Sequence, residues 1–264
     1  PGTLFDNFDR ADAVYPCEKL LSFESDGNLL LKYFVTLFPV GKGQRVLVSG
    51  VPKSGKSTLL RCINLLETPT SGEILYKGKN IQTEIPSLYR YRAEVGMVFQ
   101  QFNLYNNMDV LQNCVIGQKL VMKRSKQEAE ELAMKYLTTV GMKQFINAKP
   151  RQLSGGQKQR LSIARALAHP CRILILDDSS SALDYATDAQ VRKNIREQYS
   201  DVTVIAVSQR VGSIKHCDML LVMDDGRLAG CGTHDELMKS CEVYREIYFS
   251  QFPEDRAKYE RGEM

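Results

Sequence analysis

The sequence lacks the clusters of side chains that mark many catalytic and metal sites. Only three histidines occur among its 264 residues, and His169, His216 and His234 stand apart from one another. Because metal ligands and catalytic bases are usually grouped, we expect no catalytic role for any of the three.

Cysteine pairs with metal-binding spacing are also missing. The seven cysteines are odd in number, scattered and never spaced as C-x-x-C. A metal site or a disulfide framework is therefore disfavoured, and reduced cytosolic thiols are the better interpretation. These cysteines are Cys17, Cys62, Cys114, Cys171, Cys217, Cys231 and Cys241.

No apolar run is long enough for a membrane span, which needs roughly 20 residues. The longest, residues 29–40, is interrupted by Lys32 and closed by Pro39 and Gly41. No secretory signal is visible. Because the first residue is Pro1 rather than Met, we expect a fragment or a processed form.

A strong charge imbalance is absent too. The net charge is +4, and no block of basic residues predicts nucleic-acid binding. With 43% hydrophobic and 25% charged residues, the composition is that of a soluble globular protein. The length is enough for one large domain or two lobes.

What the sequence does contain is a phosphate-binding pattern, G-x-x-x-x-G-K-[ST]. It is formed by Gly50, Val51, Pro52, Lys53, Ser54, Gly55, Lys56 and Ser57. An apolar strand is predicted at 45–49 and a helix at 57–66, which is the context that the pattern requires. Backbone N–H groups and the helix dipole should hold phosphates, Lys56 should reach the β- and γ-phosphates, and Ser57 should ligate Mg²⁺.

Further strands and helices predict an α/β fold. Apolar strands at 173–176, 203–207 and 219–223 alternate with helical segments, as in a mostly parallel sheet covered by helices. Segments 72–81 and 95–99 are predicted as strands of an antiparallel edge layer. Residues 108–141 have a helical pattern, in which Ser125 to Glu128 forms a helix start.

A second motif, LSGGQ at residues 153–157, lies between the phosphate loop and the strand that ends at Asp177. With both motifs, the chain resembles the nucleotide-binding domain of ATP-binding cassette (ABC) transporters from about Leu29 to about Phe252. The resemblance implies an α/β P-loop NTPase fold of ABC type with an antiparallel β layer and a helical subdomain. We expect one ATPase domain over 1–264, with its core at about 1–105 and 157–250, the helical subdomain at about 106–156 and a charged tail at 253–264, expected to be a frayed helix.

The resemblance assigns the nucleotide ligands. It implies an α-phosphate contact for Thr58 and a Mg²⁺-ligating amide for Gln100, which fits the family's Q-loop better than Gln101 does. Asp177, at the carboxyl edge of the sheet, is placed to hold Mg²⁺ through water. For the aromatic that stacks on adenine, Phe23 is the nearest candidate, Tyr15 would need an insertion, and a core aromatic is an equally good interpretation of Phe23.

Other residues are implied to act across a dimer. In the family, the LSGGQ motif faces the γ-phosphate bound to the opposite subunit. Here it would do so through Ser154, Gly155, Gly156 and Gln157. Asp184 matches the D-loop, which joins the two sites.

Three departures from the family pattern affect the chain's own site. Lys53 replaces a usual glycine and would cost roughly 1–2 kcal/mol if its φ is positive. Asp178 stands where active members have a Glu that polarises water, and Gln209 stands where they have a His on the γ-phosphate. Both losses predict an ATP site that binds ATP and hydrolyses it slowly, as in asymmetric ABC heterodimers.

Different parts of the chain resemble different kinds of ABC ATPase. Residues 61–159 are similar to ATPases of polar amino-acid importers, whereas the part from Ile173 onward resembles the degenerate half of a multidrug-type exporter pair. The implied function is that of an ATP-hydrolysing subunit on the cytoplasmic face of a membrane, with ATP and Mg²⁺, a second nucleotide-binding subunit and transmembrane subunits as partners. A nucleotide-binding regulatory module, or a soluble ABC ATPase with negligible turnover, is the alternative.

Overall fold

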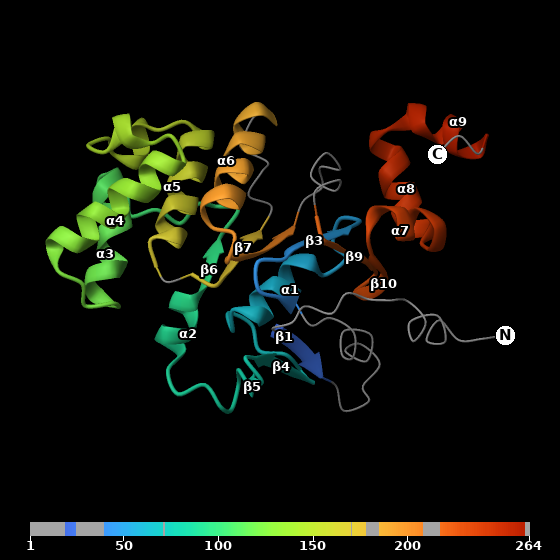
Figure 1. Ribbon diagram of the computed structural model, residues 1–264, viewed down its shortest axis with the longest axis horizontal. Coiled ribbons are helices and arrows are strands. Elements are labelled where there is room, and N and C mark those ends of the chain that lie inside the picture. Colours follow the sequence, from blue (N-terminus) through green and yellow to red (C-terminus); the bar gives the residue numbers. More distant parts are fainter. Residues whose placement is uncertain are drawn as a thin grey trace.

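A six-stranded sheet forms the centre of the protein (Figure 1). The computed structural model describes residues 40–70, 72–169, 171–177, 186–207 and 217–261, and the backbone alone of 19–24 and 185. The sheet has the order β10-β9-β3-β8-β7-β6. Its strands are β3 (Arg45–Gly50), β6 (Val95–Val98), β7 (Ile173–Asp177), β8 (Thr203–Val207), β9 (Met219–Asp224) and β10 (Arg227–Gly232).

All neighbouring strands of this sheet are parallel except β10, which is antiparallel to β9. Strand β7 is buried along its whole length because helices cover both faces of a parallel sheet. The three apolar strands predicted in the second half of the chain are thus confirmed as β7, β8 and β9. In a parallel sheet the carboxyl ends of the strands meet at one edge, so Gly50 and Asp177 lie on the same side.

The prediction for residues 95–99 was wrong in one respect. They form β6, which pairs in parallel with β7 instead of joining the antiparallel layer. A seven-residue helix, α2 (Leu88–Glu94), makes the crossover into the main sheet. A short apolar run does not reveal which sheet it enters, because its strand partners lie far away in the sequence.

The antiparallel layer predicted around residues 72–81 is confirmed. It has four strands in the order β2-β1-β4-β5. These are β1 (Lys19–Glu24), β2 (Val40–Gly41), β4 (Glu73–Tyr76) and β5 (Lys79–Asn80).

Helix α1 (Lys56–Ile63) follows the phosphate loop, but it ends before the predicted Leu66. Leu65 has a φ of 52°, which no α-helix accommodates. The Arg92 side chain donates to the carbonyls of Asn64 and Leu65 at 3.1 and 2.8 Å. These bonds satisfy backbone carbonyls at the end of the helix, and their donor lies about 27 residues farther along the chain.

Three helices gather at one end of the sheet, in green and yellow in Figure 1. They are α3 (Val110–Leu120), α4 (Lys126–Thr139) and α5 (Gly155–Leu167), with short 3-10 turns at Lys143–Phe145 and Pro150–Gln152. All three begin at capping boxes, and the helix start predicted at Ser125 is confirmed as the N-cap of α4.

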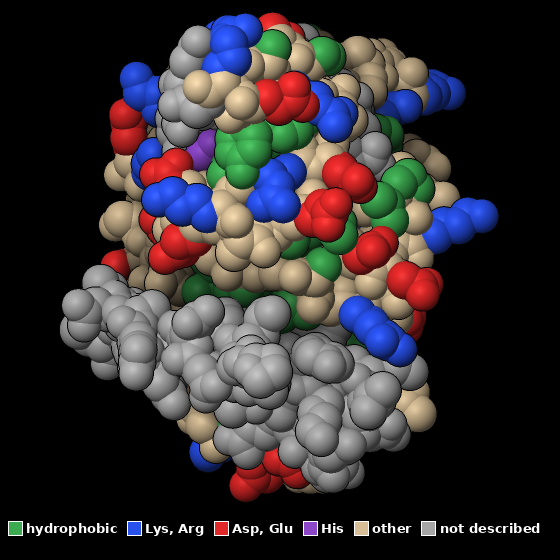
Figure 2. Space-filling model, turned by 90° about the vertical axis from the view of Figure 1, so that its right-hand side faces the viewer, with side chains coloured by type: hydrophobic (Ala, Val, Ile, Leu, Met, Phe, Trp, Pro, Cys, Tyr) green, Lys and Arg blue, Asp and Glu red, His purple; other side chains and the backbone are tan. Residues whose placement is uncertain are grey.

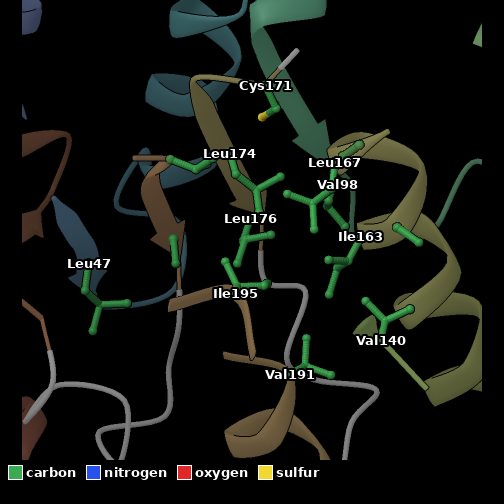
Figure 3. Close-up of a cluster of buried hydrophobic side chains, with 14 of the residues drawn as sticks. Leu47, Val98, Val140, Ile163, Leu167, Cys171, Leu174, Leu176, Val191 and Ile195 are labelled. Carbon is green, nitrogen blue, oxygen red and sulfur yellow. The ribbon is translucent and has the colours of Figure 1, made fainter. Parts of the chain in front are cut away.

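Helices α5 and α6 (Tyr185–Gln198) pack beside β7 in the larger core cluster (Figure 3). Leu174 and Leu176 of β7 lie between Ile163 and Leu167 of α5 and Ile195 of α6. All five side chains are buried. This packing fixes α5 relative to the central sheet.

The chain ends in three short helices at the opposite end of the sheet from α3 and α4 (Figure 1). They are α7 (His234–Ser240), α8 (Glu242–Gln251) and α9 (Pro253–Glu260). The charged tail is thus helical through residue 260 and docked, because the Tyr248 hydroxyl donates to Asp255 at 3.0 Å and the Tyr259 hydroxyl to the Met238 carbonyl at 3.2 Å.

On the face built by these helices, basic and acidic side chains are interspersed over the described part of the surface (Figure 2). Within the described ranges, no helix is both long and apolar enough to cross a bilayer.

Candidate nucleotide site

Two glycines shape the loop between β3 and α1. Gly50 has a φ of 155°, and a Cβ there would lie 2.2 Å from the Met223 carbonyl oxygen. Gly55 has a φ of 88° at the N-cap of α1. Both positions therefore require glycine, and the loop between them forms a turn that curls over the start of the helix.

The N-terminus of α1 is left open for an anion. Among the described residues, no side chain caps it, in contrast to α3, α4, α5 and α7, which carry capping boxes. The first backbone N–H groups of a helix have no intrahelical partner, and the helix dipole gives that end a partial positive charge. Exposed Thr58 lies in this first turn. The geometry fits a phosphate.

Lys56 lies inside the loop, with 7% of its surface exposed. Its Nζ donates to the carbonyls of Gly50 and Val51 at 2.9 and 2.5 Å and to the Ser54 hydroxyl at 3.0 Å. These contacts hold the ammonium group where phosphates would enter.

Ser57 and Asp177 come together although they are far apart in the sequence. The Ser57 hydroxyl donates to Asp177 Oδ1 at 2.7 Å, and Asp177 is 4% exposed at the carboxyl end of β7. A hydroxyl and a carboxylate are the hard oxygen ligands that Mg²⁺ prefers. This donor set fits magnesium.

Lys53 does adopt the conformation that makes its replacement of glycine costly. Its φ is 66°, in the left-handed region, and its side chain is exposed. The expected strain of roughly 1–2 kcal/mol is therefore built into the phosphate loop.

Replacing Lys53 with glycine should raise the free energy of unfolding by about 0.5–1 kcal/mol, the strain relieved less the added entropy of the unfolded chain. Urea denaturation measures this. Lys53→Ala keeps the strain and should show no gain. Exposed Lys119 lies in the last turn of α3, and Lys119→Gly should lower the free energy of unfolding by up to about 1 kcal/mol. Equal effects of the two glycine variants would contradict the backbone explanation.

Gln100 lies just past the end of β6, at the edge of the sheet that also carries Asp177. It sits in a turn closed by the bond from Phe102 N to the Phe99 carbonyl, at 3.2 Å. Both Gln100 and the rejected alternative Gln101 are exposed.

The LSGGQ motif forms the start of α5. Ser154 is the N-cap, and its hydroxyl accepts from Gln157 N at 3.3 Å while Gln157 Oε1 accepts from Ser154 N at 2.8 Å. Ser154 and Gly155 are exposed, and Gly156 is half-buried. The Ser154 hydroxyl and the first backbone N–H groups of α5 therefore lie at an exposed helix N-terminus, where an anion from another molecule can approach.

Several predicted residues fall outside the described part of the chain. These are Asp178, Asp184, Gln209 and the alternative aromatic Tyr15. Phe23 is on β1, where its backbone pairs with Ile74 of β4. The roles assigned to all five stay predictions.

The buried cysteines have thiols of low reactivity. Burial raises the pKa of the Cys114 and Cys171 thiols to about 12, so both stay protonated at neutral pH. The six cysteines within the described ranges are free thiols.

Sequence reasoning missed the support of the loop by β9. The Met223 carbonyl packs on Gly50, and its methyl group lies near Gly55. A short-range pattern carries no signal for this contact, because it depends on β9 pairing with β3.

Comparison with known proteins agrees with this geometry. The ABC transporter family matches residues 36–181. The glutamine transport ATP-binding protein GlnQ of Geobacillus stearothermophilus is 38% identical over 221 residues, which are 83% of this chain and 87% of that protein.

Two solved structures are similar in fold. A dimeric ATP-binding cassette in a post-hydrolysis state with ADP and Pi superposes with a TM-score of 0.70 at 27% identity, over 82% of this chain and 97% of that one. A bacterial Atm1-family ABC exporter with ATP bound gives 0.74 at 29% identity, over 92% of this chain and 44% of that one. The chain therefore belongs to the ABC transporter family, as one of its nucleotide-binding domains.

Proposed function

We propose that this chain is an ATP-binding and ATP-hydrolysing subunit that powers a membrane transporter from the cytoplasmic face of the membrane. The observation that carries the proposal is the Ser57–Asp177 hydrogen bond of 2.7 Å beside the uncapped start of α1. It joins a hydroxyl and a carboxylate at the point where phosphates would meet Lys56. The identity with a glutamine transport ATP-binding protein favours amino-acid import as the transport served.

Each residue of the site has a separate task. The amides of the loop and Thr58 bind phosphate oxygens, and Lys56 offsets the charge of the β- and γ-phosphates. Ser57, Asp177 and Gln100 supply oxygen ligands for Mg²⁺. When bound, magnesium neutralises phosphate charge.

Dimerisation completes the site. The exposed start of α5 presents Ser154, Gly155 and Gly156 to the γ-phosphate held by a second nucleotide-binding subunit. The dimeric ATP-binding cassette among the similar structures supports assembly of this kind. ATP then acts as the link between two subunits, and Asp184 connects the sites.

The chain's own catalytic site is degenerate in this proposal. Asp178 is one methylene shorter than glutamate, so its carboxylate falls short of the water that it must polarise, and a misplacement of about 1 Å can cost about 100-fold in rate. Gln209 can donate a hydrogen bond to the γ-phosphate. Its neutral amide cannot transfer a proton and has no positive charge.

A double substitution tests this. Asp178→Glu with Gln209→His should raise ATPase turnover about 5- to 10-fold, because the pair restores water positioning and a γ-phosphate donor. Steady-state turnover is measured at a protein concentration that gives dimers, alone and with a consensus partner cassette. A double variant no faster than the parent would show that these residues do not limit the site.

The same pair of residues favours a second candidate, a nucleotide-binding regulatory module with negligible turnover. A parent chain that binds ATP but hydrolyses none, even with a consensus partner, would select this candidate over the transport ATPase.

A further inference from the structure

The turn that carries Gln100 continues into two residues with left-handed backbone. Phe102 and Asn103 are consecutive and have φ values of 60° and 49°. The left-handed region is disfavoured for side chains with a Cβ, and especially for a bulky aromatic residue. Such a conformation persists only where the surroundings impose it, and strained backbone is concentrated at functional sites.

Helix α5 imposes this conformation through two side chains. The Ser162 hydroxyl lies 3.1 Å from the Phe102 carbonyl and 3.0 Å from the Lys158 carbonyl of its own helix, so its single proton is shared between these two acceptors. Arg165 donates to the Phe102 carbonyl through Nη2 at 3.0 Å and to the Asn103 carbonyl through Nη1 at 2.6 Å. The planar guanidinium therefore bridges both left-handed residues, with charge-assisted bonds that a neutral group could not match.

The helix that provides this clamp is itself immobilised. Ile163 and Leu167, which flank Arg165 in the sequence, pack against β7 in the core (Figure 3). Ser162 is 1% exposed, and burial lowers the pKa of Arg165 although the group stays charged. The Arg165 guanidinium also lies 5.9 Å from the centre of the Tyr105 ring, farther along the same loop.

Gln100 therefore has a fixed backbone on both sides. β6 holds the residues before it in the central sheet, and the clamp holds the residues after it on the helix that begins with LSGGQ. Gln100 itself is exposed, at the edge of the sheet where β7 also ends.

We propose that Arg165 and Ser162 are positioning residues for ATP hydrolysis, which fix the turn at residues 99–103 and thereby aim Gln100 at the nucleotide. The inference rests on the proposed function, because it takes Gln100 to be a ligand of Mg·ATP. It goes further in assigning a role to two side chains that touch neither nucleotide nor metal.

A double-mutant cycle on the full chain tests the inference. Single-turnover hydrolysis of Mg·ATP is measured with protein in excess for Arg165→Met, Gln100→Ala and the double variant. Arg165→Met should slow hydrolysis about 10-fold, since it displaces a group that must be accurately placed. If Arg165 acts through Gln100, the double variant should be no slower than Gln100→Ala alone. Affinity for ATP should change less than about twofold in Arg165→Met, because the phosphate loop is untouched.

Arg124→Met is the matched control for lost stability. Arg124 donates to Gln118 Oε1 at 2.9 Å and to the Ala168 carbonyl at 3.0 Å, close to the same helix but away from the turn. The Arg124→Met variant should hydrolyse ATP at the parent rate. Amide hydrogen exchange over residues 99–105 should increase in Arg165→Met and, less strongly, in the milder Ser162→Ala, but not in Arg124→Met.

Three results would overturn the inference: equal slowing by Arg124→Met, multiplicative losses in the double variant, or unchanged exchange over 99–105 in Arg165→Met. If Gln100→Ala hydrolyses at the parent rate, the aiming role fails while ATP hydrolysis itself stands. A parent that hydrolyses nothing contradicts the proposed function instead, and the exchange measurement then decides whether the clamp exists.

Discussion

Replacing Lys56 with alanine is expected to reduce the affinity for Mg·ATP by about 100-fold, or about 2.7 kcal/mol. The buried ammonium group lies at the centre of the phosphate loop, so its charge acts where solvent screening is weak. Removing it leaves the β- and γ-phosphates without their cationic partner. Equilibrium binding of a fluorescent ATP analogue measures the loss.

The same substitution removes a donor from two loop carbonyls, so folding has to be checked separately. Circular dichroism and thermal unfolding serve that purpose. Lys42→Ala is the matched control, because exposed Lys42 precedes β3 at the end opposite the phosphate loop. It should bind ATP as the parent does. A Lys56→Ala variant that binds equally well would contradict the nucleotide site.

Damage to the two ATP sites of a heterodimer should have unequal consequences. In a heterodimer with a consensus cassette, Ser154→Arg should reduce hydrolysis by about 100-fold, because it places bulk where the partner's γ-phosphate must dock and misplaces the reacting groups. Asp178→Asn should remove little more activity, since the site that it serves is already slow. Turnover is measured with one altered subunit at a time.

Ser125→Arg controls for the lost helix cap. Ser125 and Ser154 are both exposed N-caps in capping boxes, so each substitution should cost about 1 kcal/mol of stability. Only Ser154→Arg should impair hydrolysis, and both variants should still bind ATP. Equal losses from Ser154→Arg and Asp178→Asn would mean that the two sites are equivalent and that the degenerate-site hypothesis is wrong.

Local patterns were the part of the fold that could be predicted well. The loop from Gly50 to Ser57 was expected between a strand and a helix, and it lies between β3 and α1. The helix starts at Ser125 and Ser154 were also predictable, because a capping box is formed by residues only three positions apart.

Predictions failed where distant segments decide the structure. Residues 95–99 were expected in the antiparallel layer, but the pairing of 95–98 with β7 places this strand in the central sheet. The end of α1 was misplaced because Arg92, on another helix, binds the carbonyls at which it stops. Neither partner is visible within a short window of sequence.

The sequence by itself determined which chemical groups are available: a glycine loop with a lysine, a carboxylate after a buried strand, and a serine and two glycines that open a helix. These depend on residue type and short spacing, since glycine conformations, helix caps and buried strands arise from neighbours in the chain. Only the tertiary structure brought the Ser57 hydroxyl to Asp177 and placed Arg165 on the turn after Gln100. Those arrangements depend on parallel strand pairing and on the packing of α5 against β7, which join segments that are far apart in the sequence.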